Sequence, residues 1–338
     1  MTIQSEPVQS KSAQNKSAQN NLPQSKPTWA GDDLLSRCVN LLIQTKPIYA
    51  LMKQQARQVL IKTAEQNGVP WRQQAEQLAA SGIQQQLAQI INPAIQYPDY
   101  YQVPFHAYEA GNLCWQAAFE AEPATQAMAL RVWKDEPLNW QEAQERLRGS
   151  FHQVLAQRIA SPVQDILDIG CSVGLSTLAL HRFYQDRQNR QELPVCTVGL
   201  DLSPYMLAVA QYRDSQQEIA AWIHANAEAT GLPDGSFDLV TLQFVTHELP
   251  GWATTAIFRE AFRLLRPGGH LAIVDNNPES PVIQNLPPVL FTLMKSTEPW
   301  SDDYYTFNLE AAMQAVGFEQ VTTVASDPRH RTIVGSRP

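Results

Sequence analysis

Hydrophobic residues follow two different rhythms along this chain. From Asp32 to about Gly149 they recur every three or four positions, which is the spacing of one face of a helix. From Val163 onward, short apolar runs alternate with amphipathic segments, which is typical of strands alternating with helices. The pattern therefore predicts an all-helical N-terminal part followed by an α/β part.

The N-terminal part is predicted to form short helices joined by an irregular aromatic link. Asp32 or Asp33 is a suitable cap for the first helix, and Pro47 fits the first turn of the second. The link lies between Pro93 and Pro104. The helices are expected over residues 34–43, 48–60, 71–80, 83–91, 111–120, 124–133 and 140–160.

The second part predicts a mostly parallel sheet with helices on both faces, because strand–helix units repeat. Residues 278–305 do not follow this alternation, and the last two strands are close enough to pair as a hairpin. The strands are expected over residues 166–169, 195–200, 221–224, 237–242, 271–274, 318–324 and 331–335.

The first residues contain Ser, Gln, Asn, Lys and Pro with almost nothing apolar, and the pentapeptide KSAQN occurs twice in tandem. Such a segment cannot bury enough surface to offset its conformational entropy. We therefore expect a disordered tail over residues 1–30, a helical module over 31–150 and an α/β domain over 151–338.

Composition narrows the class of protein. The 338 residues carry a net charge of −8, all of it on residues 151–338, because residues 1–150 are neutral overall. General binding to nucleic acid or anionic membranes needs a basic surface. No apolar run reaches the ~20 residues of a membrane span, and the N-terminus lacks an apolar signal core. We expect a cytoplasmic protein with no nucleic-acid partner and no membrane span.

The four cysteines predict no metal site. Cys38, Cys114, Cys171 and Cys196 form no C-x-x-C pair, and no histidine lies at zinc-ligand spacing beside them. Buried free thiols in a reducing compartment are the expected state.

The chemistry-bearing segment follows the first predicted strand: Asp165-Ile-Leu-Asp168-Ile-Gly170-Cys-Ser172-Val-Gly174-Leu-Ser176. Its small residues let the backbone turn sharply and approach a ligand. Ligands of open α/β sheets bind beyond the carboxyl ends of the strands, where this loop would lie. Asp201 ends the second strand, and an acid there can accept hydrogen bonds from ribose hydroxyls.

The loop lacks the G-x-G-x-x-G spacing of a pyrophosphate site, and Asp168 precedes its first glycine. A carboxylate there repels phosphate and suits an ammonium or sulfonium group. The loop resembles the first motif of the class I S-adenosylmethionine-dependent methyltransferases, with Ser172 in place of the commoner middle glycine. Residues 198–206, 226–228, 232–240 and 262–271 resemble the later motifs in order.

Within this family the chain looks most like the small-molecule branch that includes the ubiquinone/menaquinone-biosynthesis methyltransferases. The resemblance implies a Rossmann-like, seven-stranded, mostly parallel sheet with a terminal antiparallel hairpin, and S-adenosylmethionine as the cofactor. Asn226 stands where the family usually has Asp, and Met206 has core packing as its alternative role. The implied cofactor-binding residues are Asp168, Gly170, Ser172, Gly174, Asp201, Leu202, Met206, Asn226, Ala227, Gln243 and Phe244.

Two histidines are candidate catalytic residues. His247 follows the fourth strand, and His106 lies in the aromatic N-terminal segment. Imidazole is the natural base near neutral pH, while a capping or structural role for His247 stays open. Methyl transfer needs a nucleophile aligned behind the sulfonium carbon, so positioning can supply much of the rate.

Aromatic side chains are dense around residues 100–115 and 291–305, as expected of a cap over an acceptor pocket. Ordinary packing of the module and a dimer contact are the alternatives. The predicted substrate contacts are Tyr101, Tyr108, Trp115, Met294, Trp300 and Tyr304.

The sequence therefore predicts in-line methyl transfer to an oxygen, carbon or nitrogen of a small aromatic or apolar acceptor. The helical module would exclude water from the sulfonium. A nicotinamide-dependent oxidoreductase and a non-catalytic binding protein are the rival functions. The missing G-x-G-x-x-G and the closing hairpin argue against the first, and the nearly intact loop argues against the second. A homodimer stays open.

Overall fold

A computed structural model describes residues 46–106, 108–188, 194–287 and 297–338. The predicted tail over 1–30, the predicted helix over 34–43 and Met294 lie outside the described residues. All seven predicted strands are present; six lie within one residue of their expected bounds, and the strand expected over 271–274 is longer.

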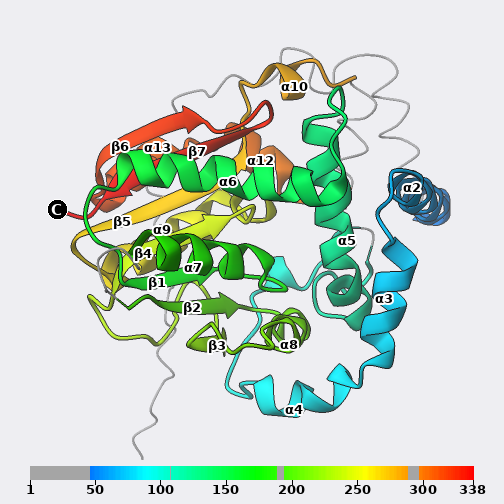
Figure 1. Ribbon diagram of the computed structural model, residues 1–338, viewed down its shortest axis with the longest axis horizontal. Helices are drawn as coiled ribbons and strands as arrows, with labels where there is room; N and C mark the ends of the chain where they lie inside the picture. Colours follow the sequence, from blue (N-terminus) through cyan, green and yellow to red (C-terminus); the bar gives the residue numbers. More distant parts are fainter. Residues whose placement is uncertain (1–45, 107, 189–193, 288–296) are drawn as a thin grey trace, which may run out of the picture.

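The strands are β1 (Asp165–Ile169), β2 (Cys196–Asp201), β3 (Ala221–His224), β4 (Phe237–Gln243), β5 (Leu265–Asn276), β6 (Glu319–Ala325) and β7 (His330–Ser336). They form one sheet in the order β3-β2-β1-β4-β5-β7-β6 (Figure 1). The pairs from β3 to β5 are parallel, and β7 is antiparallel to both β5 and β6. The predicted fold class is therefore confirmed.

Side chains of the central strand β1 alternate between two helical layers. On one face Ile166 packs with α6 (Trp140–Arg158) and α7 (Leu175–Gln188). On the other face Leu167 packs with α9 (Gly251–Leu264) and Ile169 belongs to the same core, which extends to α13 (Leu309–Val316). Burial on both faces explains why the parallel strands read as continuous apolar runs.

The other helices of the α/β part are shorter. Ser203 caps α8 (Pro204–Arg213), its Oγ accepting from the amide of Met206 at 3.3 Å. The remaining elements are η3 (Thr246–Glu248), α10 (Pro281–Gln284) and α12 (Ser301–Thr306).

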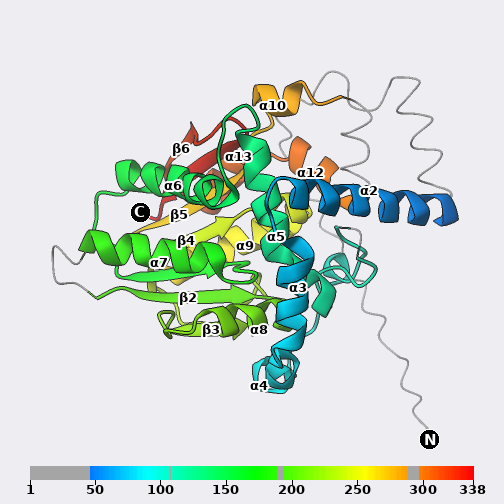
Figure 2. The same cartoon turned by 45° about the vertical axis from the view of Figure 1, so that its right-hand side comes forward.

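The helical module consists of α2 (Lys46–Gln66), α3 (Trp71–Ala80), η1 (Ile83–Gln86), α4 (Leu87–Ile90), η2 (Asp99–Tyr101) and α5 (Trp115–Val132). It stands beside the carboxyl ends of the parallel strands (Figures 1 and 2). Phe119 of α5 shares a hydrophobic core with Met206 of α8. The module therefore packs at the edge of the sheet where ligands of such folds bind.

The prediction of two helices over 111–120 and 124–133 is wrong. A single helix, α5, runs through Pro123. A proline inside a helix costs about 3 kcal/mol because one hydrogen bond is lost and the ring clashes with the preceding turn. Here α5 packs against α3, α6 and α8, and this buried contact outweighs the local preference for a break.

Two other boundaries differ from the sequence pattern. The helix expected over 83–91 is divided into η1 and α4. β5 begins at Leu265 instead of residue 271, because Leu265 pairs with Phe237 on one side of an irregularity and His270 pairs with Leu239 on the other. Gly268, with φ of +81°, lies in this irregularity.

The division of the chain at residue 150 stays a prediction, and α6 spans this position. Among the residues that the structure describes, none of the helices combines the length and the apolar character that a membrane crossing requires.

Candidate functional site

Polar side chains gather at the carboxyl ends of five neighbouring strands. Asp168 lies near the end of β1, Asp201 ends β2, His224 ends β3, Gln243 ends β4 and Asp275 lies near the end of β5. All five are buried. Parallel strands that are neighbours in the sheet bring their carboxyl ends to one edge, so the topology assembles residues that lie far apart in the sequence.

The loop after β1 adopts backbone conformations that demand small residues. Gly170 and Gly174 have φ of +71° and +80°. A Cβ at Gly170 would lie 2.5 Å from Val245 Cγ2, and one at Gly174 would lie 2.6 Å from Trp222 Cη2. Both glycines are therefore required by left-handed backbone and by close neighbours, and the loop keeps a fixed shape.

Ser172, the middle residue of this loop, also has a left-handed backbone, with φ of +49°. Its amide donates to Asp201 Oδ2 at 2.8 Å, which holds the strained residue in place. Its hydroxyl lies 3.6 Å from Met206 Sδ. Ser172, Asp201 and Met206 thus form one connected group, as a shared cofactor site would need.

Asp201 is arranged to accept further hydrogen bonds. Oδ2 accepts from the amide of Ser172 and Oδ1 accepts from the amide of Ser203, each at 2.8 Å. A carboxylate has about four lone-pair positions, so each oxygen keeps acceptor capacity for one more donor. Burial raises the pKa of Asp201 to about 6, although the two amide hydrogen bonds oppose the rise.

Asp168 points into the protein instead of into the loop. It accepts from Thr177 Oγ1 at 2.6 Å, from Thr241 Oγ1 at 2.7 Å and from Gln243 Nε2 at 3.1 Å. Burial raises the pKa of Asp168, and these hydrogen bonds work against that rise. The observed role of this carboxylate is to fix β1, β4 and α7 relative to one another and to orient Gln243.

The other predicted cofactor residues lie around the same edge. The main-chain oxygen of Leu202 accepts from His224 Nε2 at 3.1 Å, and Asn226 Oδ1 accepts from the amide of Glu228 at 3.0 Å. Ala227 packs against the main core. Phe244 packs its ring edge-on to His330 at 5.1 Å, on the α6 side of the sheet. Their contacts with a cofactor stay predictions.

Residues of the helical module cover the ends of β2 and β3. The amide of Asn92 donates to His224 Nδ1 at 2.9 Å, and Tyr97 Oη lies 3.3 Å from His224 Nε2. Tyr97 stacks on Tyr101 at 6.4 Å. Burial raises the pKa of Tyr101, and the charges of Asp201 and Glu248 raise it further.

His247 forms a buried pair with Asp275. Nδ1 lies 2.8 Å from Asp275 Oδ1, and the amide of His247 donates to Oδ2 at 3.1 Å. Burial disfavours the imidazolium, but the charge of Asp275 outweighs burial and raises the pKa of His247 to about 10. The pKa of Asp275 is lowered, since the attraction of His247 overcomes its burial. Because Nδ1 is engaged by Asp275, Nε2 is the ring nitrogen that remains for another partner.

His106 and Glu298 lie close to His247. His106 Nε2 is 3.8 Å from Glu298 Oε1, and its amide donates to the carbonyl of Thr297 at 2.9 Å. His106, His247 and Glu298 offer three possible metal-ligand atoms within 4.8 Å of one another. A protonated His247 has no lone pair for a metal, so this arrangement favours an ion-paired cluster. The expectation of no metal stays a prediction.

Glu248 and Asn112 connect this cluster to the loop end of the site. Asn112 Nδ2 donates to Glu248 Oε2 at 3.2 Å, and its carbonyl accepts from Ser203 Oγ at 2.7 Å. Because Ser203 also donates its amide to Asp201, one chain of hydrogen bonds joins Asp201 to the neighbourhood of His247.

The predicted substrate residues divide into two groups. Tyr304 lies edge-on to His247 at 6.3 Å, and Trp300 Nε1 donates to the carbonyl of Tyr100 at 3.2 Å. Tyr108 instead donates to Glu120 at 2.8 Å, and Trp115 packs between Phe119 and Tyr205. Tyr304 is thus brought to the His247 cluster, whereas Tyr108 and Trp115 are placed inside the module and against α8.

Sequence reasoning missed Asp275, Glu298 and the linking role of Asn112. Asp275 carried a signal, because it follows a short apolar run at a strand end as Asp168 and Asp201 do. Glu298 lies in a segment without periodicity, and nothing in the sequence pairs it with His106.

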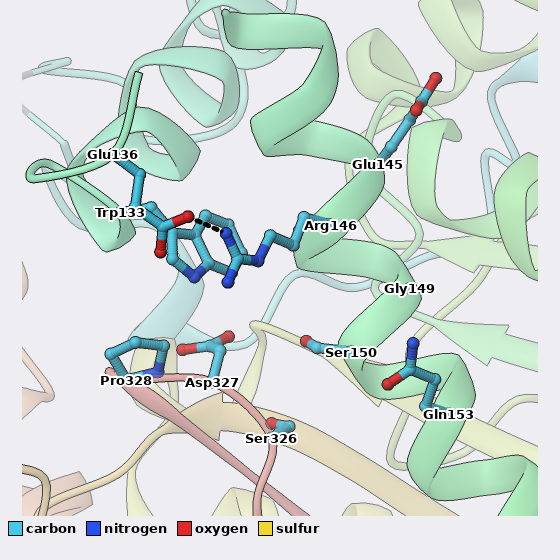
Figure 3. A pocket seen from close by; sticks show the side chains of 10 residues that line it. All are labelled: Trp133, Glu136, Glu145, Arg146, Gly149, Ser150, Gln153, Ser326, Asp327 and Pro328. Carbon is cyan, nitrogen blue, oxygen red and sulfur yellow. Dashed lines mark hydrogen bonds and ion pairs between the residues drawn. The ribbon is translucent and has the colours of Figure 1, made fainter. Parts of the chain in front are cut away.

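A surface pocket of about 450 Å³ lies elsewhere, between α6 and the turn that joins β6 to β7 (Figure 3). Arg146 lies over the Trp133 ring, 4.9 Å from its centroid, and pairs with Glu136. None of the predicted site residues lines this pocket, which is formed by Trp133, Glu136, Glu145, Arg146, Gly149, Ser150, Gln153, Ser326, Asp327 and Pro328.

Comparison with known proteins gives a family match. A family model described as "Methyltransferase domain" matches residues 167–273, which run from β1 to β5. A demethylmenaquinone methyltransferase of Lactiplantibacillus plantarum is 33% identical over 136 residues, which are 39% of this chain and 54% of the relative. An uncharacterized methyltransferase of Synechocystis is 32% identical over 126 residues, 37% of this chain and 53% of the relative.

The chain thus spans about half the length of the curated relatives it matches. Among solved structures, a SAM-dependent methyltransferase from Aquifex aeolicus is 16% identical with a TM-score of 0.42; the match covers 62% of this chain and 98% of that chain.

Proposed function

We propose that this chain, whose residues 167–273 form a methyltransferase domain of the S-adenosylmethionine-dependent class, transfers a methyl group from that cofactor to a small acceptor. The match of residues 167–273 to a methyltransferase domain supports the family resemblance, and S-adenosylmethionine is the cofactor that this resemblance implies. The observation that carries the proposal is the loop Gly170–Gly174 held against Asp201, whose oxygens keep free acceptor capacity.

The residues present fit the cofactor's functional groups. Asp201 would accept from both ribose hydroxyls, and the small-residue loop would let the backbone approach the methionine end. Gln243, oriented by Asp168, would face the same end. S-adenosylmethionine supplies an activated methyl on a positively charged sulfur, which suits a site surrounded by carboxylates.

We propose that the His247–Asp275 pair takes up the proton that the acceptor loses when it is methylated. Asp275 holds Nδ1, so in the neutral form of His247 Nε2 is the nitrogen that would accept a proton from an acceptor hydroxyl, amine or acidic carbon. His106 and Glu298 lie next to the His247 imidazole and would orient polar groups of the acceptor. Alignment of the nucleophile with the sulfonium carbon supplies much of the rate.

The acceptor is proposed to be small and aromatic or apolar. Tyr304 supports this because its ring lies edge-on to His247, and Trp300 follows Glu298 of the same cluster by two residues. Tyr101, stacked on Tyr97, is the candidate from the module side. The curated relative from Lactiplantibacillus plantarum is named a demethylmenaquinone methyltransferase, so reduced demethylmenaquinone is the first acceptor to test. Tyr108, Trp115 and Met294 stay predicted contacts.

The proposal is tested first by cofactor binding. S-adenosylhomocysteine and S-adenosylmethionine should each raise the unfolding temperature, because a ligand that binds only the folded state stabilises it by mass action. NAD and NADP at the same concentrations should not. A shift with a nicotinamide cofactor alone would favour an oxidoreductase and would reject the methyltransferase.

Cofactor affinity should depend on pH through Asp201. Its pKa of about 6 in the free protein means that the carboxylate gains a proton below this pH and loses acceptor capacity. The dissociation constant of S-adenosylmethionine should therefore rise as pH falls below 6, by up to about tenfold per pH unit. Isothermal titration calorimetry between pH 5 and 8 measures this slope, which should be absent in Asp201→Asn. An equal slope in that variant would assign the dependence to another group.

A further inference from the structure

Arg148 on α6 is a partly buried cation that has no acidic partner among the residues that the structure describes. Its Nε lies 3.4 Å from Ser176 Oγ, and its Nη1 donates to the amide oxygen of Gln144. In the part of the chain that the structure describes, no carboxylate forms an ion pair with Arg148, and Nη2 makes no hydrogen bond. Buried charges are normally paired, so an uncompensated guanidinium points to an anionic ligand.

The charge of Arg148 affects the pKa of its neighbour His152. Burial lowers the pKa of Arg148 to about 10. Burial together with the charge of Arg148 lowers the pKa of His152 to about 4, so this histidine is neutral and does not add to the positive charge. Ser176, Gln144 and the neutral His152 therefore leave the positive charge of Arg148 uncompensated.

Arg148 is placed next to the proposed cofactor site. Ser176 lies in the first turn of α7, directly after the loop that ends at Gly174. Leu147, the preceding residue of α6, packs in the same cluster as Phe244, which follows β4. Arg148 itself is thus held by α6 against the first turn of α7.

The shape of the cofactor indicates which of its groups would lie near Arg148. With its ribose on Asp201 after β2 and its methyl directed to His247 after β4, its methionine end must lie across the loop between these strands. That end carries a carboxylate, and the first turn of α7 offers unpaired amides that favour negative charge. A guanidinium can bind a carboxylate through two parallel hydrogen bonds.

We propose that Arg148 binds the methionine carboxylate of S-adenosylmethionine, with Ser176 and Gln144 holding the guanidinium in place. This inference rests on the proposed function. It assigns to α6 a direct part in cofactor recognition, because the hydrogen bonds of Arg148 to Ser176 and Gln144 go to uncharged groups and leave its positive charge uncompensated.

The experiment compares two cofactors that differ only in that carboxylate. Affinities for S-adenosylmethionine and for its decarboxylated analogue are measured by calorimetry with Arg148→Gln, Arg148→Lys and wild type. Arg158→Gln, the same change in the last turn of the same helix, is the matched control. Thermal unfolding verifies that each variant is folded.

Arg148→Gln should weaken S-adenosylmethionine binding by about 10- to 100-fold and leave binding of the decarboxylated analogue unchanged. Arg148→Lys should fall between, because it keeps the charge and loses the paired geometry. Arg158→Gln should match wild type for both ligands.

Equal weakening for both ligands, or wild-type affinity for both, would overturn the role of Arg148 and leave the proposed function intact. A wild-type protein that binds neither ligand would instead reject the proposed function and this inference with it.

Discussion

Replacing Asp201 with alanine should weaken S-adenosylmethionine binding by about 10²- to 10⁴-fold. Two ribose hydroxyls would lose a charged acceptor, and hydrogen bonds to charged groups contribute about 1.5–3 kcal/mol each. The amides of Ser172 and Ser203 would also lose the carboxylate that now holds them, each at 2.8 Å. Calorimetric titration of both ligands, cofactor and S-adenosylhomocysteine, measures the loss.

Asp238 provides a matched control at the opposite edge of the sheet. Its carboxylate also accepts from two backbone amides, those of Gln164 and Asp165, at 2.9 and 3.0 Å. Asp238→Ala should lower the unfolding temperature and leave cofactor affinity unchanged. If Asp201→Ala binds the cofactor as tightly as Asp238→Ala does, the ribose assignment is wrong.

Replacing His247 with asparagine should reduce the turnover number by about 10²- to 10⁴-fold, which is the usual contribution of a positioned general base. Cofactor affinity should change little, because His247 lies on the acceptor side and Asp201 on the ribose side. Turnover is measured as methyl transfer to reduced demethylmenaquinone or to the acceptor that a panel of small aromatic compounds identifies. Wild-type turnover in a folded His247→Asn protein would reject the assignment.

The pH profile separates a base from a merely structural histidine. With a pKa raised to about 10, His247 is protonated at neutral pH, so kcat/KM should increase with pH above 7 as the neutral imidazole becomes available. Asp275→Asn removes the charge that raises this pKa, so the increase should move to lower pH while the maximal rate falls. If the pH dependence of kcat/KM in Asp275→Asn equals that of the wild type, a group other than His247 titrates in this range.

The order of strands and helices was predictable because it depends on short-range patterns. Alternating apolar runs, a proline in the first turn of α8 and Gly317 after α13 act within a few residues of themselves. The same holds for the loop Gly170–Gly174, where spacing alone indicates a tight turn after a strand. Pro123 shows the limit of local rules, since α5 continues through it on the strength of packing with other helices.

The candidate site was predictable only in part. Sequence placed Asp168 and Asp201 at strand ends, but the structure turns Asp168 inward to Thr177, Thr241 and Gln243. A sequence pattern fixes where an acid lies along a strand, whereas its hydrogen-bond partners come from β4 and α7.

The sequence by itself determined the α/β alternation, the glycine loop and the family to which they point, because each depends on residues that lie close together in the chain. Only the tertiary structure decided that His247 pairs with Asp275, that His106 meets Glu298, and that Arg148 has no acidic partner among the described residues. These contacts join strand ends, a helix and loops that are distant in the chain. Sheet order and helix packing bring them together, and neither is encoded in local periodicity.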